Sequence, residues 1–290
     1  MTEKKTMVDI AVIGTGPAGV SAALTAFARG KSFTLFGPKD LSAKISKAHE
    51  INNYPGLYGK TGAQIAQEFK KQLALLNISI EEKRVTNIYN MGGYFTLLAG
   101  QEQYEAKTVI IAAGVDFGKP LTGEKDFLGR GVSYCATCDG MLYKGKTVAV
   151  LSYADSEEKE AEFLASICKK VYYIPQYTGV KLKESAVLQI IQDTPVEIKG
   201  ALKAASLVLK NQTVETDCIF ILRESIAPAT LLEGLQMDAN HVAVDRACRT
   251  NIPGVFAAGD ITGTPYQYAK AAGEGNVASL SAVNFLSKAK

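Results

Sequence analysis

Short apolar runs rich in β-branched and aromatic residues alternate along the chain with segments of helical periodicity. The predicted strands cover residues 9–13, 33–36, 85–89, 94–98, 109–113, 147–151, 171–174 and 217–222. The predicted helices cover residues 17–29, 63–76, 156–168 and 270–286. This alternation is typical of an α/β fold, in which helices cover a mainly parallel sheet.

Two passages rich in Gly, Pro or polar residues interrupt the pattern, at 114–131 and 245–253. They predict a discontinuous domain of residues 1–117 and 245–290, with a second domain of residues 118–244 inserted into it. The length of 290 residues fits two domains, since domains average roughly 150 residues.

The composition excludes several classes of protein. Hydrophobic residues make up 47% and charged residues 21% of the chain, as in globular proteins. The net charge of +3 lacks the basic excess of nucleic-acid binders, so no nucleic-acid partner is expected. The uncharged run 10–28 resembles an export signal, but Gly14, Gly16, Pro17 and Gly19 break it into a strand and a helix. We therefore expect a cytoplasmic protein with no membrane partner.

A glycine loop, Gly14-Thr15-Gly16-Pro17-Ala18-Gly19, follows the first strand and opens the first helix. In this context the glycines allow a tight turn, close approach of a dinucleotide pyrophosphate and close helix–strand packing. The acidic residue expected about twenty residues further on is replaced by Phe36-Gly37-Pro38-Lys39. We expect the ribose to be held differently, with Lys39 approaching a phosphate.

A second signature ends the apolar run 254–258 with Gly259-Asp260. The carboxyl edge of an α/β sheet is where ligands bind, so Asp260 is a candidate acceptor for a sugar or ribityl hydroxyl. Its position is equally consistent with a helix N-cap.

The cysteine pair in Cys135-Ala136-Thr137-Cys138-Asp139-Gly140 indicates redox chemistry. Two intervening residues allow a reversible disulfide, and Asp139 is placed to transfer the proton that its cleavage requires. A zinc site would need two further ligands at metal spacing, and an inert disulfide is the other alternative. No metal is expected, and Cys168, Cys218 and Cys248 are predicted to be buried.

Together these motifs resemble the low-molecular-weight thioredoxin reductase family. The resemblance rests on the glycine loop and on 53–56 (Asn-Tyr-Pro-Gly), 112–114 (Ala-Ala-Gly), 129–140 and 254–260. It implies two Rossmann-like, three-layer ββα domains of the flavoprotein disulfide reductase type, one FAD per chain and a homodimer. Cys138 would face the flavin, Cys135 would attack the disulfide of thioredoxin, and Asp139 would be the acid/base. The FAD contacts it implies are Gly14, Gly16, Pro17, Ala18, Gly37, Pro38, Lys39, Ile45, Asn53, Ala113, Gly114, Gly259, Asp260, Gln267, Tyr268 and Ala269.

The chain departs from that family where NADPH would bind. The glycine positions of the second fingerprint read Ser152-Tyr153-Ala154, and the cationic run that grips the 2′-phosphate reads Pro175-Gln176-Tyr177. Asp155 and Glu158 have the spacing of a capping box, while Glu157 and Glu160 would repel a dianionic ligand. NADPH is therefore not expected to bind.

This combination is similar to the clostridial type of ferredoxin-dependent flavin thioredoxin reductase. That resemblance implies reduced ferredoxin as the electron donor, FAD as the only cofactor and thioredoxin as the acceptor. Tyr268 is a candidate to stack near the isoalloxazine ring. The alternatives are an NADPH-dependent thioredoxin reductase, a two-flavin disulfide oxidoreductase with a second flavin in the degenerate site, and a flavin redox sensor without turnover.

Overall fold

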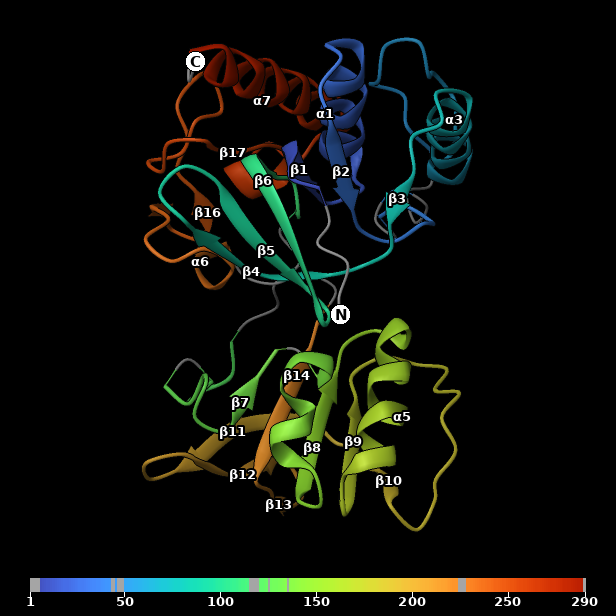
Figure 1. The fold of residues 1–290 in the computed structure, drawn as a ribbon. Coiled ribbons are helices and arrows are strands. Elements are labelled where there is room, and N and C mark those ends of the chain that lie inside the picture. The colour runs from blue at the N-terminus through green and yellow to red at the C-terminus, as the bar shows by residue number, and fades with distance from the viewer. Residues whose placement is uncertain are drawn as a thin grey trace. The chain divides into compact units, whose positions relative to one another are not determined.

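The computed structural model describes residues 6–42, 45, 50–114, 120–124, 126–134, 136–223 and 228–288. The chain divides into two compact units, one formed by Met1–Val115 with Ala227–Lys290 and the other by Asp116–Ile226 (Figure 1). Every predicted strand and helix is present, with ends that differ by a few residues. Strand β6 departs most, because it begins at Glu102, well before the predicted start.

The first unit is built on a sheet with the strand order β3-β2-β1-β6-β5-β4, in which β17 also pairs with β6. Its strands are β1 (Val8–Ile13), β2 (Phe33–Phe36), β3 (Ile80–Glu81), β4 (Val85–Asn90), β5 (Phe95–Ala99), β6 (Glu102–Ile111) and β17 (Val255–Ala257). The first half of β6 pairs antiparallel with β5, and its second half pairs parallel with β1 and β17. The long β6 thus joins an antiparallel meander to a parallel Rossmann-like sheet.

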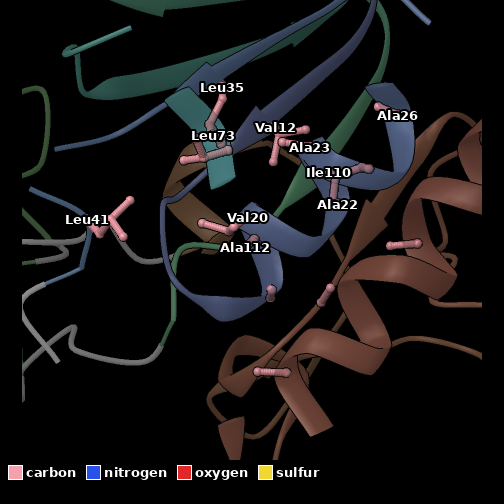
Figure 2. Packing of buried hydrophobic residues seen from close by; sticks show 14 of the residues in the cluster. Val12, Val20, Ala22, Ala23, Ala26, Leu35, Leu41, Leu73, Ile110 and Ala112 are labelled. Carbon is pink, nitrogen blue, oxygen red and sulfur yellow. The ribbon is translucent and has the colours of Figure 1, made fainter. Parts of the chain in front are cut away.

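Helices cover this sheet through small side chains. They are α1 (Pro17–Ala28), α3 (Gly62–Leu75) and α7 (Tyr268–Lys288), and α1 and α7 lie side by side (Figure 1). A Cβ at Gly275 of α7 would come within 2.0 Å of the Ala18 carbonyl oxygen, so glycine permits this close crossing. Figure 2 shows Ala22, Ala23 and Ala26 of α1 among the buried residues that fill this core. The tight packing fixes the start of α1 against the sheet.

The remaining short elements of the first unit lie towards its C-terminal end. They are α6 (Pro228–Leu231), β15 (Met237–Asp238), β16 (His241–Val242) and the 3₁₀ helix η3 (Asp260–Thr262).

The second unit has a parallel sheet with the strand order β10-β9-β8-β14-β7. Its strands are β7 (Val132–Ser133), β8 (Thr147–Ser152), β9 (Lys170–Pro175), β10 (Leu188–Ile190) and β14 (Cys218–Leu222). An antiparallel sheet contains β11 (Pro195–Gly200), β12 (Ala204–Leu209) and β13 (Thr213–Glu215). The helical segments are α4 (Ala136–Asp139), η1 (Gly140–Tyr143), η2 (Asp155–Glu157) and α5 (Glu158–Ile167).

Alternating residues of β8 show that the second unit has three layers. Ala149 and Leu151 belong to a core with residues of β11, β12 and β13. Val148 and Val150 belong to a different core with Ala161 and Leu164 of α5. Successive side chains of a strand point to opposite faces, so the parallel sheet lies between the antiparallel sheet and α5. This is the ββα arrangement of the expected fold class.

The structure places the second boundary between the units earlier than the sequence predicted. The expected boundary lay between residues 244 and 245, whereas the first unit already begins again at Ala227. Leu232 forms a bridge with Ile88 of β4, and the Asn251 amide donates to the carbonyl of Gly234. The polar passage 245–253 is a set of turns leading into β17, because turns and linkers share the same residue types.

Candidate functional site

The glycine loop connects β1 to α1 at the carboxyl edge of the first unit's sheet. Gly14 has φ +115°, and a Cβ there would lie 2.2 Å from the Ala112 carbonyl oxygen, so only glycine fits this turn. Gly16 has φ −75°, and the nearest atom to a Cβ at this position is Ser42 Cβ at 4.0 Å. Gly14 is therefore required by the packing of the turn, whereas the space in front of Gly16 is open to a ligand.

The N-terminus of α1 has the features of an anion site. Its N-cap is Gly16, which supplies no side-chain oxygen, and no acidic residue stands in the first turn. Unpaired N–H groups and the positive end of the helix dipole favour a phosphate there. The loop thus fits the pyrophosphate of a dinucleotide, and the expected contacts Pro17 and Ala18 form this first turn.

Gly37 closes the same edge at the end of β2. It has φ +149°, and a Cβ would lie 2.8 Å from Thr15 Cγ2. The Thr15 hydroxyl donates to the Pro38 carbonyl at 3.2 Å, so 37–38 packs against the glycine loop. Lys39 is paired with Glu82 at 3.0 Å on the surface.

The turn after β17 reaches the start of α1 from the other side. Gly259 has φ +89°, and its Cβ position lies 2.9 Å from Ala18 Cβ. The Gly259 N–H donates to Glu274 Oε2 at 2.8 Å, and Lys270 Nζ donates to the Gly259 carbonyl at 2.9 Å. Lys270 Nζ also lies 3.2 Å from Glu274 Oε2 and forms an ion pair with it. This pair was not predicted, although opposite charges four residues apart in a helix are a readable signal.

Asp260 follows this turn as the first residue of η3. The N-cap of η3 is Gly259, so the N-cap interpretation of Asp260 is wrong. Burial raises the pKa of Tyr268, and the negative charge of Asp260 raises it further.

The other expected flavin contacts fall into three places in the first unit. Asn53 Nδ2 donates to Gln267 Oε1 at 2.5 Å, which brings together residues far apart in the sequence. Ile45 is only 1% exposed and belongs to the core beneath α1. Residues at the carboxyl edge of the parallel strands surround the start of α1: Gly14, Gly16, Pro17, Ala18, Gly37, Pro38, Ala113, Gly114, Gly259 and Asp260.

The redox motif lies at α4 in the second unit. Cys135 lies outside the described residues, and for Cys138 the structure describes the backbone, within α4, but not the side chain. Asp139 ends α4, and its Oδ2 accepts a hydrogen bond from the Ser133 hydroxyl of β7 at 2.7 Å. Ser133 thereby fixes the orientation of the proposed proton donor, a role that no sequence signal indicated.

The degenerate glycine positions are occupied by packed side chains. Ser152 is fully buried, and its hydroxyl donates to the Ala154 carbonyl at 2.9 Å. The guanidinium carbon of Arg223 lies 5.0 Å from the centre of the Tyr153 ring. Side chains thus fill the turn where a nucleotide fingerprint would leave backbone exposed.

The carboxylates at the start of α5 do not make the hydrogen bonds that the sequence predicted. The capping box of Asp155 and Glu158 is not formed, since a 3₁₀ turn begins at Asp155 without a side-chain cap. Glu158 Oε1 instead accepts from the Tyr177 hydroxyl at 2.6 Å and from the Lys181 N–H at 2.9 Å. Tyr177, one of the three positions expected to be cationic in an NADPH site, therefore donates a hydrogen bond to a carboxylate.

A buried ion pair lies beside the redox motif. Arg223 Nη1 and Nη2 donate to the two oxygens of Glu124 at 2.6 and 2.8 Å, and the two side chains are 9% and 2% exposed. The Tyr134 hydroxyl also donates to Glu124, at 2.8 Å. Burial favours protonation of Glu124, but hydrogen bonds from Arg223, Leu121 and Tyr134 hold its pKa below the usual value. The network anchors the residue that precedes Cys135.

The remaining cysteines are buried and unpaired, as predicted: Cys168, Cys218 and Cys248. Burial raises the pKa of both Cys218 and Cys248 to about 12. The described side chains contain no cluster of His, Cys, Asp and Glu that could hold a metal ion. None of the helices in the described ranges is long and apolar enough to cross a membrane.

The fold and the two sites together define a disulfide oxidoreductase of the flavoprotein class. The chain belongs to the pyridine nucleotide-disulphide oxidoreductase family, whose model matches residues 8–275. It is a thioredoxin reductase-like oxidoreductase, as the relatives show.

Three of these relatives cover nearly the whole chain. The thioredoxin reductase of Helicobacter pylori is 35% identical over 97% of this chain and 99% of its own length. The ferredoxin-flavin thioredoxin reductase of Clostridium acetobutylicum has 47% identity and a TM-score of 0.93, over 98% of this chain and 99% of its own. A thioredoxin reductase from Gloeobacter violaceus has 26% identity and a TM-score of 0.83, over 98% and 95%.

Proposed function

We propose that this protein reduces thioredoxin through FAD and the Cys135–Cys138 disulfide, with electrons supplied by reduced ferredoxin rather than NADPH. The observation that carries the choice of donor is the packed turn 152–154, where Tyr153 covers Arg223 and Ser152 is buried and hydrogen-bonded. The likeness to the clostridial ferredoxin-flavin enzyme supports the same choice.

The first unit supplies the residues that would hold FAD. The open backbone at Gly16 and the first turn of α1 fit the pyrophosphate, and Asp260, at the start of η3, would accept a hydrogen bond from a hydroxyl of the ribityl chain. Bound FAD would supply the link between one-electron donation by ferredoxin and two-electron reduction of a disulfide. Lys270 and Glu274 hold the turn that carries Asp260 in place.

The second unit supplies the groups that handle thiols and protons. Cys135 would attack the disulfide of thioredoxin, and Cys138 would then close the intramolecular disulfide and release the product. Asp139, oriented by Ser133, would protonate the departing sulfur. We also propose one FAD per chain and a homodimer, both from the family resemblance.

Supplying ferredoxin and NADPH in separate assays tests the choice of electron donor. With a ferredoxin-reducing system, thioredoxin is reduced at a steady rate, and with NADPH alone the rate stays at background. The measurement is the appearance of thioredoxin thiols under nitrogen. Comparable rates with NADPH would contradict the proposal, and no turnover with either donor would favour a redox sensor. A flavin-to-protein ratio of two would favour a two-flavin enzyme.

Asp139→Asn is expected to reduce steady-state thioredoxin turnover by about 10²-fold or more, because it removes the proton donor. Flavin content should not change, since Asp139 is not among the residues expected to hold FAD. Ser133→Ala should have a smaller effect, because the carboxylate stays but loses its 2.7 Å hydrogen bond. Full turnover in Asp139→Asn would exclude this acid/base role.

A further inference from the structure

Glu160 contacts the backbone between the two cysteines. Its Oε2 accepts a hydrogen bond from the Thr137 N–H at 2.9 Å, and its Oε1 accepts one from the Thr137 hydroxyl at 3.4 Å. Both carboxylate oxygens are thus directed at one residue of the redox motif. Nothing in the sequence indicated this contact.

The same face of α5 packs tightly against the redox segment. A Cβ at Gly140 would lie 2.9 Å from Phe163 Cε1, 3.0 Å from Leu164 Cδ2 and 3.4 Å from Ile167 Cδ1. These residues stand three, four and seven positions after Glu160, so all four lie on one helix face. Glu160 is therefore held at the end of a close-packed contact.

We propose that Glu160 is a positioning residue of the redox disulfide, which holds Thr137 in place and sets a negative charge beside the cysteine pair. This inference rests on the proposed function, in which Cys135 and Cys138 exchange electrons with thioredoxin. A carboxylate beside the pair disfavours the thiolate and keeps the reduced pair in its thiol form. A dithiol whose thiolate is not stabilised is the stronger reductant.

The charge of Glu160 affects the direction of thiol–disulfide exchange with thioredoxin. The reduced pair gives two electrons and two protons to thioredoxin, whose S–S bond breaks to give two thiols while the Cys135–Cys138 bond forms. The charge of Glu160 opposes accumulation of the thiolate and so favours this direction.

Other titratable groups surround α4 and remain unchanged when Glu160 is replaced. They lie on α4 itself, on η1, around β14 and at the end of α5: Asp139, Tyr143, Asp217, Cys218 and Cys168. A difference between variants at position 160 therefore reports Glu160 alone.

The decisive variant is Glu160→Gln, which keeps an oxygen acceptor for Thr137 but removes the charge. The holoprotein is reduced with dithiothreitol and desalted, and iodoacetamide labelling of the 135/138 peptide is followed against pH by mass spectrometry. We expect the midpoint of the labelling profile to fall by about half to one pH unit, with labelling at pH 7 about threefold to tenfold faster. Glu162→Gln, an exposed carboxylate on the same helix, is the matched control and should follow the wild type.

Two further outcomes separate the parts of the proposal. Glu160→Ala should show the same shift in labelling and also lose turnover, because Thr137 is no longer held. Overlapping profiles for wild type and Glu160→Gln would overturn the role of the charge, as would a shift in Glu160→Ala alone. Because the thiols are reduced chemically, a wild type that never reduces thioredoxin would refute the proposed function without affecting this readout.

Discussion

Gly16→Val gives a folded protein that does not retain flavin. The backbone of Gly16 is unstrained and its Cβ position is open, so the fold tolerates a side chain there. That side chain occupies the space where the pyrophosphate would approach the N–H groups of α1. Hydrogen bonds to a charged group contribute about 1.5–3 kcal/mol each, so loss of two should weaken binding by about 10²-fold or more.

Variants at two other glycines serve as a comparison and a control for Gly16→Val. Gly14→Ala should lower the free energy of unfolding by at least about 3 kcal/mol, because its Cβ meets the Ala112 carbonyl oxygen at 2.2 Å. Gly93→Val, whose Cβ position is also open, should change neither stability nor flavin content. The measurements are the flavin-to-protein absorbance ratio and urea unfolding. Full flavin content in Gly16→Val would contradict the assignment of the pyrophosphate site.

Arg223→Met destabilises the second unit more than any surface substitution in it. Glu124 would remain buried without its cationic partner, and breaking a buried pair in this way costs about 3–5 kcal/mol. The double variant Glu124→Gln, Arg223→Met should recover a large part of this loss, since no buried charge remains. Lys181→Met removes a pair whose side chains are 76% and 59% exposed, and should cost under about 0.5 kcal/mol.

The loss in the free energy of unfolding caused by Arg223→Met should become smaller as pH falls. In the wild type the folded-state pKa of Glu124 is lowered, so its contribution is present at neutral pH and is lost as pH falls through that pKa. In Arg223→Met the lowering by the Arg223 hydrogen bonds and charge is lost. We expect burial to outweigh the remaining hydrogen bonds from Leu121 and Tyr134 and to raise the pKa of Glu124. Protonation of Glu124 then relieves the unpaired charge as pH falls. Urea unfolding of the wild type and Arg223→Met at pH 7 and pH 5 should show a smaller difference in the free energy of unfolding at pH 5. An equal difference at the two pH values would contradict the role given to Glu124.

The sequence predicted the central parallel strands and the long helices because their apolar runs are continuous. The two- and three-residue parallel strands β3, β7 and β10 were missed because they are too short to show a pattern. The antiparallel strands β11 and β12 were missed, since two register shifts in their pairing interrupt the period of two. Strand β13 was missed because it has only 3 residues. The second boundary was misplaced because the residues that form turns also form linkers.

The candidate sites were predictable to different degrees. The glycine loop was recognised because its spacing reflects backbone geometry. The contacts of Glu160 with Thr137 and of Asn53 with Gln267 were not, because a sequence does not show where a side chain points. The loss of the glycines at 152–154, by contrast, was visible directly.

The central claim is that electrons enter from ferredoxin and not from NADPH. The most direct test is an anaerobic titration of the purified holoprotein with NADPH, NADH and chemically reduced ferredoxin, followed by flavin absorbance. Bleaching by ferredoxin alone, reversed by oxidised thioredoxin, is the predicted result. Rapid bleaching by NADPH would contradict the account and show that the packed turn at Ser152 and Tyr153 does not exclude the nucleotide.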